Sequence, residues 1–386
     1  GMTQAKVGVS QMFPRGDTLD IKSQQLRIQS EAFPFQRQDR EAKVAVTVGS
    51  LWLDAYRVQQ SIALIEKNRS LFEQLADIAE ASYSSALGKT RQQDIVRAQL
   101  ELTKLEDRLE KLGQQKNRFE GMLSQWLTKF STGNDSVEAT LYSDFSLHDI
   151  ELSQQIPQID LLNNKLVHSK SWLNPLELVQ YFTSHPSVVA IEKKVSATKA
   201  SIKLAEQKYQ PEWGVSASYG YRADDPMGRS RADLFSVGVT FDLPLFTENR
   251  QDKEVQSAIF KTEAVKTEKF LLLRQLLGSY SSAKGRLLRL KDRQNLYTSK
   301  LLPQIHDQAE ASLTAYTNDD GDFAEVVRSR IAVLNAEIDE LTLNVEEQKI
   351  SLELNYLFIG SIKTAMTTNN MNYTSSGQYA ASVGEK

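Results

Sequence analysis

Acidic side chains gather at one break in a sequence that is otherwise mostly helical in its periodicity. Four carboxylates lie close together, at Asp319, Asp320, Asp322 and Glu325. Carboxylates at this density repel one another and attract cations. A solvated turn that leads into a helix has the same composition, because the helix dipole stabilises acids near an N-terminus. The sequence leaves both interpretations open, a cation-attracting cluster or an ordinary turn.

Two arginines each stand three residues after an acid. Arg97 follows Asp94, and Arg328 follows Glu325. Side chains at this spacing share one face of a helix, so each pair predicts an intrahelical ion pair, which contributes only about 0.2–0.5 kcal/mol.

Other residues that often carry chemistry are scattered or absent. The four histidines, His148, His168, His185 and His306, have no second ligand at helical spacing, so the sequence predicts no metal site. The chain has no cysteine, which excludes disulfides and zinc thiolates. It also shows no phosphate-binding loop and no acid paired with an adjacent base. We therefore expect no enzyme and no cofactor.

The charge balance gives no indication of a nucleic-acid partner. The 386 residues carry 46 basic and 49 acidic side chains, a net charge of −3. No run of 18 apolar residues occurs, so the sequence predicts no transmembrane helix.

A β-hairpin is predicted at residues 212–244. Each arm alternates between aromatic or branched residues on one face and small or polar residues on the other, and a polar loop with Pro226 and Gly228 joins the arms. Arms of about ten residues with one apolar face are typical of membrane-barrel strands. A hairpin packed on a helical core is the other interpretation. The residues that would face lipid are Trp213, Val215, Tyr219, Tyr221, Phe235, Val237, Val239 and Phe241.

Long helices precede the hairpin. A strand at residues 6–14 leads into a helical pattern from 18 to 87 that only Pro34 interrupts. After a break at 88–90 a second helix is predicted at 91–129, and the short break indicates an antiparallel helical hairpin.

The same order follows the hairpin. A helix is predicted at 249–317, with a kink at Pro303, then a break at 318–321 and a return helix at 322–358. Between the two halves, residues 136–170 are predicted to be largely irregular with short helices, and a short helix is predicted at 175–183. A heptad stripe then predicts a coiled-coil face; its residues are Val188, Ile191, Val195, Thr198, Ile202, Ala205 and Tyr209.

The two halves are an internal repeat. Residues 7–9 and 237–239 both read Val-Gly-Val, and 79–82 and 309–312 both read Ala-Glu-Ala-Ser, a shift of 230 in each case. After the helix break the shift is 231, which aligns Asp94 with Glu325. Strand, long helix, break and return helix therefore occur twice.

At this point the sequence resembles the TolC-type outer-membrane efflux proteins, in particular their heavy-metal-efflux branch. The resemblance covers about residues 6–360 and rests on HPSVVAIEKKVSATKASIKLAEQKYQPEW, FSVGVTFDLPLFTENRQDKEV, LLPQ, GKTRQQDIVRAQ and YTNDDGDFAEVVRSR in this order. It implies a mainly α fold with two long antiparallel helical hairpins, one protomer of a coiled-coil α-barrel. The β-hairpin would form part of a trimeric outer-membrane β-barrel.

The resemblance also implies a function and partners. The protein would be a homotrimeric export duct of a tripartite efflux system in the outer membrane of a Gram-negative bacterium, with most of the chain in the periplasm. Its helical tips would dock a periplasmic adaptor protein and an inner-membrane efflux pump. The residues at these tips are Gly88, Lys89, Thr90, Asn318 and Gly321.

The acids and arginines near the tips would then line a gate. Acidic rings would attract cations at the pore entrance, and the arginines would form a latch between protomers as the alternative to an intrahelical pair. The residues concerned are Asp94, Arg97, Asp319, Asp320, Asp322, Glu325 and Arg328. In the second copy Asp319 stands where relatives usually carry glycine, and aspartate tolerates the left-handed conformation better than most residues.

The predicted organisation has four parts: a first repeat at 6–130, an irregular equatorial segment at 131–184, a second repeat at 185–361 and a disordered tail at 362–386. The first repeat lacks the leading helix and first strand of the second, which indicates an N-terminal truncation that leaves strand 6–14 without its hairpin partner. The alternative function is a soluble coiled-coil scaffold or interaction protein. The sequence identifies neither the exported substrate nor the pump.

Overall fold

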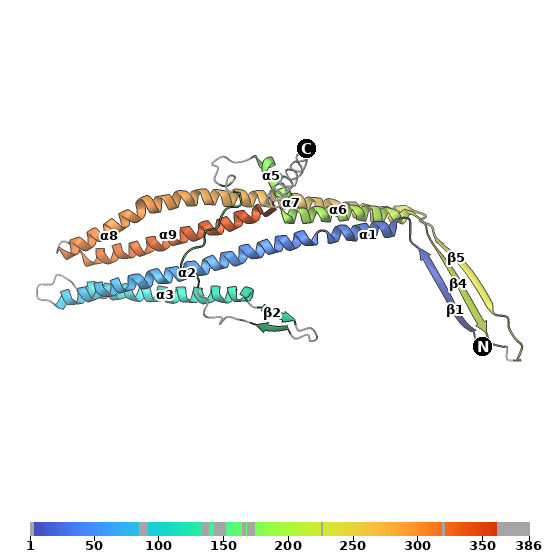
Figure 1. Ribbon diagram of the computed structural model, residues 1–386, viewed down its shortest axis with the longest axis horizontal. Coiled ribbons are helices and arrows are strands. Elements are labelled where there is room, and N and C mark those ends of the chain that lie inside the picture. Colours follow the sequence, from blue (N-terminus) through green and yellow to red (C-terminus); the bar gives the residue numbers. More distant parts are fainter. Residues whose placement is uncertain are drawn as a thin grey trace, which may run out of the picture. The chain divides into compact units, whose positions relative to one another are not determined.

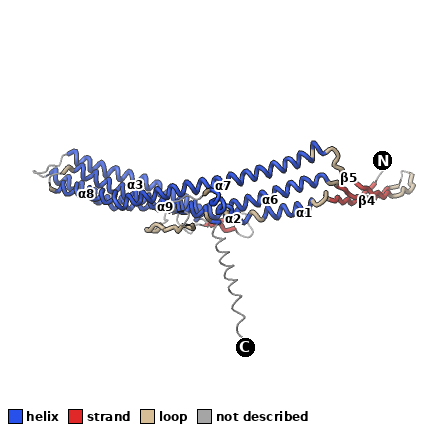
Figure 2. Tube along the Cα trace, turned by 90° about the horizontal axis from the view of Figure 1, so that it is seen from above, coloured by secondary structure: helices blue, strands red, loops and turns tan. Residues whose placement is uncertain are grey.

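The computed structural model describes residues 4–84, 92–127, 129–132, 139–142, 152–163, 167, 174–224, 227–318 and 321–360. Helices make up most of these residues (Figure 2). The chain divides into two compact units, one of residues 1–39 and 179–276 and the other of 40–178 and 277–386. No described helix is both long and apolar enough to span a membrane.

The first unit contains an antiparallel sheet of three strands in the order β1 (Gln4–Phe13), β4 (Glu212–Arg222) and β5 (Leu234–Asp242) (Figure 1). Val9 lies opposite Ala217, which lies opposite Val237. This register keeps the aromatic and β-branched apolar residues of the three strands on one face, as the period of two requires. The strand that was expected to lack its hairpin partner is paired along its whole length with β4.

The first unit contains the helices α1 (Thr18–Ser30) and α6 (Pro186–Glu206) and the start of α7 (Gln251–Leu296). A 3-10 turn at Gln207–Tyr209 leads from α6 to the sheet. Gln25 of α1 donates to the hydroxyl of Ser201 on α6 at 2.6 Å. Ion pairs join α6 to α7, including Lys194 with Glu268 at 2.8 Å.

The predicted heptad stripe of α6 is only partly correct. Val188, Val195 and Ala205 are buried, but Tyr209 is exposed, and alanines on a second side of the helix are buried as well. α6 packs closely against α1 and also faces α7 through ion pairs. Two neighbours therefore cover two sides of the helix, where the heptad predicted one.

A cluster centred on Arg15 fixes the turn between β1 and α1. Its guanidinium bonds to Glu212 at 3.1 Å and to Asp242, and donates to the carbonyl of Lys208 at 3.3 Å. The next residue, Gly16, has a φ of +43°, a conformation that glycine adopts without a Cβ clash. One arginine thus ties the ends of β4 and β5 to the turn after β1.

The second unit contains two helical hairpins. The first is formed by α2 (Phe33–Ser84, from residue 40) and α3 (Gln92–Leu127), and the second by α8 (Leu302–Thr317) and α9 (Phe323–Leu357) (Figure 1). These bounds confirm the predicted helices to within a few residues. The predicted disordered tail and the tip at 88–90 lie outside the described residues.

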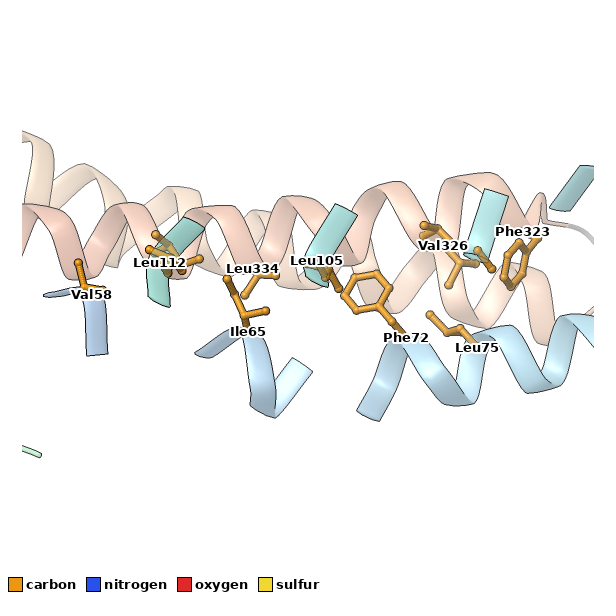
Figure 3. Packing of buried hydrophobic residues seen from close by; sticks show 12 residues of the cluster. Val58, Ile65, Phe72, Leu75, Leu105, Leu112, Phe323, Val326 and Leu334 are labelled. Carbon is orange, nitrogen blue, oxygen red and sulfur yellow. The ribbon is translucent and has the colours of Figure 1, made fainter. Parts of the chain in front are cut away.

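The core between these hairpins repeats every seven residues. Val58, Ile65 and Phe72 follow one another on α2, and Leu105 and Leu112 on α3. Figure 3 shows Phe72 against Leu105 and Ile65 beside Leu334 of α9. We call this set the tip core; its buried residues are Val58, Ile65, Phe72, Leu75, Ala98, Leu105, Leu112, Phe323, Val326, Val327, Leu334 and Ile338.

Two local features differ from the sequence prediction. A five-residue π-helical turn, η3 (Tyr297–Leu301), ends two residues before Pro303 and separates α7 from α8. The segment predicted to be irregular contains two short paired strands, β2 (Lys129–Thr132) and β3 (Ala139–Tyr142), and is followed by α5 (Pro175–Thr183). Neither KFST in β2 nor ATLY in β3 alternates strictly between apolar and polar residues, so the sequence gives no strand signal there.

Candidate functional site

The tip of the second hairpin is shaped by a cap and a close backbone approach. Asp322 is the N-cap of α9, and its carboxylate accepts from the backbone N–H of Ala324 at 3.1 Å. Asn318 is the C-cap of α8. A Cβ on Gly321 would lie 2.5 Å from the backbone nitrogen of Tyr316, so this position needs glycine. Asp319 and Asp320 lie outside the described residues.

Glu325 and Arg328 form the intrahelical ion pair that their spacing predicts. Both side chains remain accessible, at 41% for Glu325 and 69% for Arg328. Arg328 therefore already has a partner within its own helix, and the pair lies one turn beyond the cap at Asp322.

The aligned pair on the first hairpin is placed differently. Asp94 lies in the first turn of α3 and is only 5% exposed, while Arg97 is exposed. A carboxylate in the first helical turn is stabilised by the unpaired N–H groups there. Asp94 is thus buried within the chain, whereas its counterpart Glu325 is open to solvent.

A second difference between the tips was missed by the sequence analysis. Val96 and Leu100 on α3 are 57% and 52% exposed. Their counterparts at a shift of 231 are Val327, which is 2% exposed, and Ile331, which packs on the tip core. Ile78 and Tyr83 on α2 are also exposed. The alignment of the two copies could have drawn attention to these residues, but only the structure shows which copy is covered.

All eight residues predicted to face lipid lie on one exposed face of the sheet. β1 extends this face with Val7 and Val9, which are 74% and 76% exposed. Phe13 stacks on Trp213 at the end of the sheet, with ring centroids 4.1 Å apart. Val7, Val9 and Phe13 were not among the predicted lipid contacts, although their alternation was visible in the sequence.

The opposite face of the sheet is small and polar. Glycine or serine occupies its central rows, such as Gly8 beside Ser218 and Ser216 beside Gly238. A Cβ on Gly214 would lie 2.3 Å from the sulfur of Met12. The two faces therefore differ sharply in polarity within one sheet.

At the loop end of the sheet, Asp233 closes the β4–β5 connection. Its carboxylate accepts from the hydroxyl of Tyr219 and from the backbone N–H of Arg222, the latter at 3.1 Å. The Tyr219 hydrogen bond, followed by that from Arg222, lowers the pKa of Asp233 below its ordinary value.

The two described histidines with side-chain contacts have structural partners. His185 is the N-cap of α6 and accepts from the backbone N–H of Ser187 at 3.3 Å. His306 on α8 contacts the carbonyl of Leu302 and lies 3.7 Å from Glu337 of α9. Within the part of the chain that the structure describes, no three potential ligands are placed to hold a metal ion.

Long helical hairpins joined to an antiparallel sheet with one apolar face define the fold of the TolC-type outer-membrane efflux channels. The resemblance seen in the sequence is thus confirmed for the fold. No protein-family model matches the chain, and no curated protein matches it in sequence.

Solved structures of outer-membrane channels support this assignment of the fold. CusC, studied for conformational changes that accompany folding and transmembrane channel formation, shares 12% identity with a TM-score of 0.69, over 93% of this chain and 83% of CusC. The channel OprN shares 13% identity with a TM-score of 0.69, over 93% and 81%. The CmeC channel of Campylobacter jejuni shares 9% identity with a TM-score of 0.71, over 93% and 77%.

Proposed function

We propose that this protein is a passive export duct of the outer membrane, the channel component of a tripartite efflux system. The proposal is supported most by the sheet, which exposes a continuous apolar face and carries a small, polar face behind it. In a closed barrel the first face suits lipid and the second suits a water-filled lumen. Transport through such a duct needs no covalent chemistry, so we assign no enzymatic role.

The assembly we propose is a homotrimer in which each copy contributes strands to one barrel and two hairpins to a periplasmic tube. Among the residues that the structure describes, no further strand pairs with either edge of the three-stranded sheet, along β1 or β5. Open edges with an exposed apolar face associate readily with further strands. The fold shared with CusC, OprN and CmeC supports this arrangement.

The gate in this proposal lies at the helical tips. Asp322, Glu325 and Arg328 are exposed to a degree that lets them face a pore entrance, and we place Asp319 and Asp320 with them by their position in the chain. Asp94 and Arg97 hold the matching position on the first hairpin. Because the carboxylate of Asp94 is buried, we assign Asp94 a role in stabilising the tip. Arg97 is exposed and can line the pore entrance.

The tips are also the proposed docking sites for a periplasmic adaptor and, through it, an inner-membrane pump. Gly88, Lys89, Thr90, Asn318 and Gly321 mark the two turns. The exposed apolar residues Ile78, Tyr83, Val96 and Leu100 lie near the first turn, and such a patch is typical of a protein contact.

Spin labels on the sheet test the proposed function. Because the chain has no cysteine, single labels can be placed at Val215, Tyr219, Val237 and Phe241 after reconstitution in liposomes. We expect these labels to be accessible to oxygen and shielded from a water-soluble relaxation agent. Matched labels at Ser216 and Ser218, on the other face, should show the reverse.

If the labels on both faces are equally aqueous, the sheet does not lie in a bilayer. The alternative of a soluble helical scaffold would then be favoured, with a protein partner covering the apolar face.

A further inference from the structure

An extended segment of the second unit crosses from one repeat to the other. We call residues 152–163 the strap. On the side of the first repeat, two residues of α2 hold its backbone. Tyr56 donates its hydroxyl to the carbonyl of Gln154 at 3.2 Å, and the amide of Gln59 donates to the carbonyl of Leu152 at 3.3 Å.

On the side of the second repeat, two residues of α9 hold the other end of the strap. Gln348, which is 5% exposed, accepts from the backbone N–H of Ile159 at 2.8 Å. Asn355 accepts from the N–H of Leu162 and donates to the carbonyl of Asp160, both at 2.8 Å. The Asn355 amide thus occupies both backbone groups in the way that a neighbouring strand would.

Apolar contacts complete this attachment. Leu152, Ile156 and Ile159 of the strap pack on a small core between α2 and α9. The helix residues of this core are Trp52, Leu53, Tyr56, Leu341, Val345 and Leu352. The strap is therefore bonded at its backbone and partly buried through its apolar side chains on both helices.

The two helices also meet directly at this level. Lys349 pairs with Asp54 at 3.0 Å. A Cβ on Gly49 would lie 2.7 Å from a methyl carbon of Leu352, so α9 approaches α2 closely there. The tip core begins within one turn of the strap on each helix, with Val58 on α2 and Ile338 on α9. The strap thus marks the inner end of the interface that reaches the tips.

We propose that the strap is a clamp that fixes α2 to α9 and serves as the pivot for movement of the two hairpin tips. Gln348 and Asn355 are its positioning residues. With the clamp in place, α2 and α9 keep their separation at the strap, and rearrangement is confined to the tip core. Without the clamp, α2 and α9 also move apart at the level of the strap, and the tips no longer keep one closed arrangement. This role deepens the proposed function, because tip movement would gate the duct.

The central variant is Gln348→Leu with Asn355→Ala, which removes three hydrogen bonds to the strap backbone. Hydrogen exchange measured by mass spectrometry on a peptide covering residues 152–163 should become about tenfold faster, the change expected for a loss of about 1.4 kcal/mol. Gln348→Glu keeps an oxygen that accepts from the N–H of Ile159, so the strap peptide of this variant should keep much of the exchange protection that the central variant loses. Asn344→Ala is the matched control on the same helix, since Asn344 bonds to Gln294 and not to the strap.

The second measurement follows the hairpins themselves. Spin labels at Gln74 on α2 and Gln308 on α8, both exposed, report their separation by pulsed dipolar spectroscopy. We expect a broader distance distribution in the central variant and more frequent channel openings in planar bilayers. Neither should change in Asn344→Ala, and circular dichroism should show intact helices throughout.

Two results would overturn the clamp. Exchange in the strap peptide that stays at the wild-type rate would show that these bonds do not hold the strap. Faster exchange of the strap peptide with an unchanged distance distribution between the labels would show that these bonds hold the strap, but that the strap does not control the separation of the hairpins. If the wild-type protein does not conduct, the proposed function fails, while the exchange and distance measurements still decide the clamp.

Discussion

The long helices of the two repeats have the same length between strand and tip, but each carries one proline at a different level. In the first copy Pro34 is the second residue of α2, which is unbroken over its 52 residues. In the second copy α7 continues through the matching position, Ala264, and the proline comes later, at Pro303. The residue of α2 that matches Pro303 at a shift of 230 is Glu73.

The two prolines are accommodated by different means. Pro34 falls in the first turn of α2, where its missing N–H would have no helical partner in any case. Pro303 follows a continuous helix and leaves a carbonyl one turn earlier without its usual donor. The π-helical turn at Tyr297–Leu301, which ends two residues before Pro303, absorbs this mismatch. The two copies of the repeat therefore keep the same length although their helices are interrupted at different positions.

The largest effect should come from moving the second proline into the first copy. Glu73→Pro places proline in the interior of α2 and should cost about 3 kcal/mol or more of unfolding free energy. Pro303→Ala should change stability by no more than about 1 kcal/mol, because the π turn already accommodates the site. Both values come from denaturant unfolding followed by circular dichroism.

Glu73→Ala is the control for the proline, since it removes the ion pair with Arg69 without altering the backbone. A loss in Glu73→Pro no greater than that in Glu73→Ala would mean that α2 forms a π turn as readily as the second copy. The difference between the copies would then have another cause.

The sequence predicted the elements well because their signals are local. The helical stripes, the breaks and the alternation in 212–244 each depend on a few adjacent residues, and the structure confirms them. It did not predict which tip is buried. Val96 and Val327 have the same side chain and aligned positions, and only packing against the other hairpin distinguishes them.

The candidate gate shows the same limit. The spacing of Glu325 and Arg328 predicted their ion pair, and the spacing of Asp94 and Arg97 is identical. The burial of Asp94 depends on tertiary contacts that no spacing encodes. The sequence likewise did not predict the hydrogen bonds that the strap makes with Gln348 and Asn355, because they join residues about 190 positions apart.

A smaller effect is expected at the two tips, and it separates them by role. Glu325→Gln with Arg328→Gln should change unfolding free energy by less than about 0.5 kcal/mol, because an exposed intrahelical pair contributes little. Channel openings in planar bilayers should nevertheless become more frequent, since the exposed pair faces the proposed entrance.

Asp94→Asn with Arg97→Gln is the matched variant on the first hairpin. Because Asp94 is buried, this variant should lower stability more than the Glu325 variant does. Equal stability losses in both variants, or unchanged conductance in the second-hairpin variant, would remove the distinction between a holding tip and a gating tip.

The smallest effect concerns the helix break that precedes Pro34. Glu31 is the C-cap of α1, and Lys193 of α6 donates to its carboxylate at 2.7 Å. This hydrogen bond and the charge of Lys193 lower the pKa of Glu31 below its ordinary value of 4.5. The pair therefore stabilises the fold above that value, and the contribution is lost as pH falls through the lowered pKa.

The difference in unfolding free energy between wild type and Glu31→Gln should shrink over that acidic range. In a Lys193→Met background the pH dependence of the same substitution should become much smaller, because Lys193 supplies the two largest causes of the lowered pKa. An undiminished dependence would assign the stabilisation to the charge of Arg27 instead of Lys193.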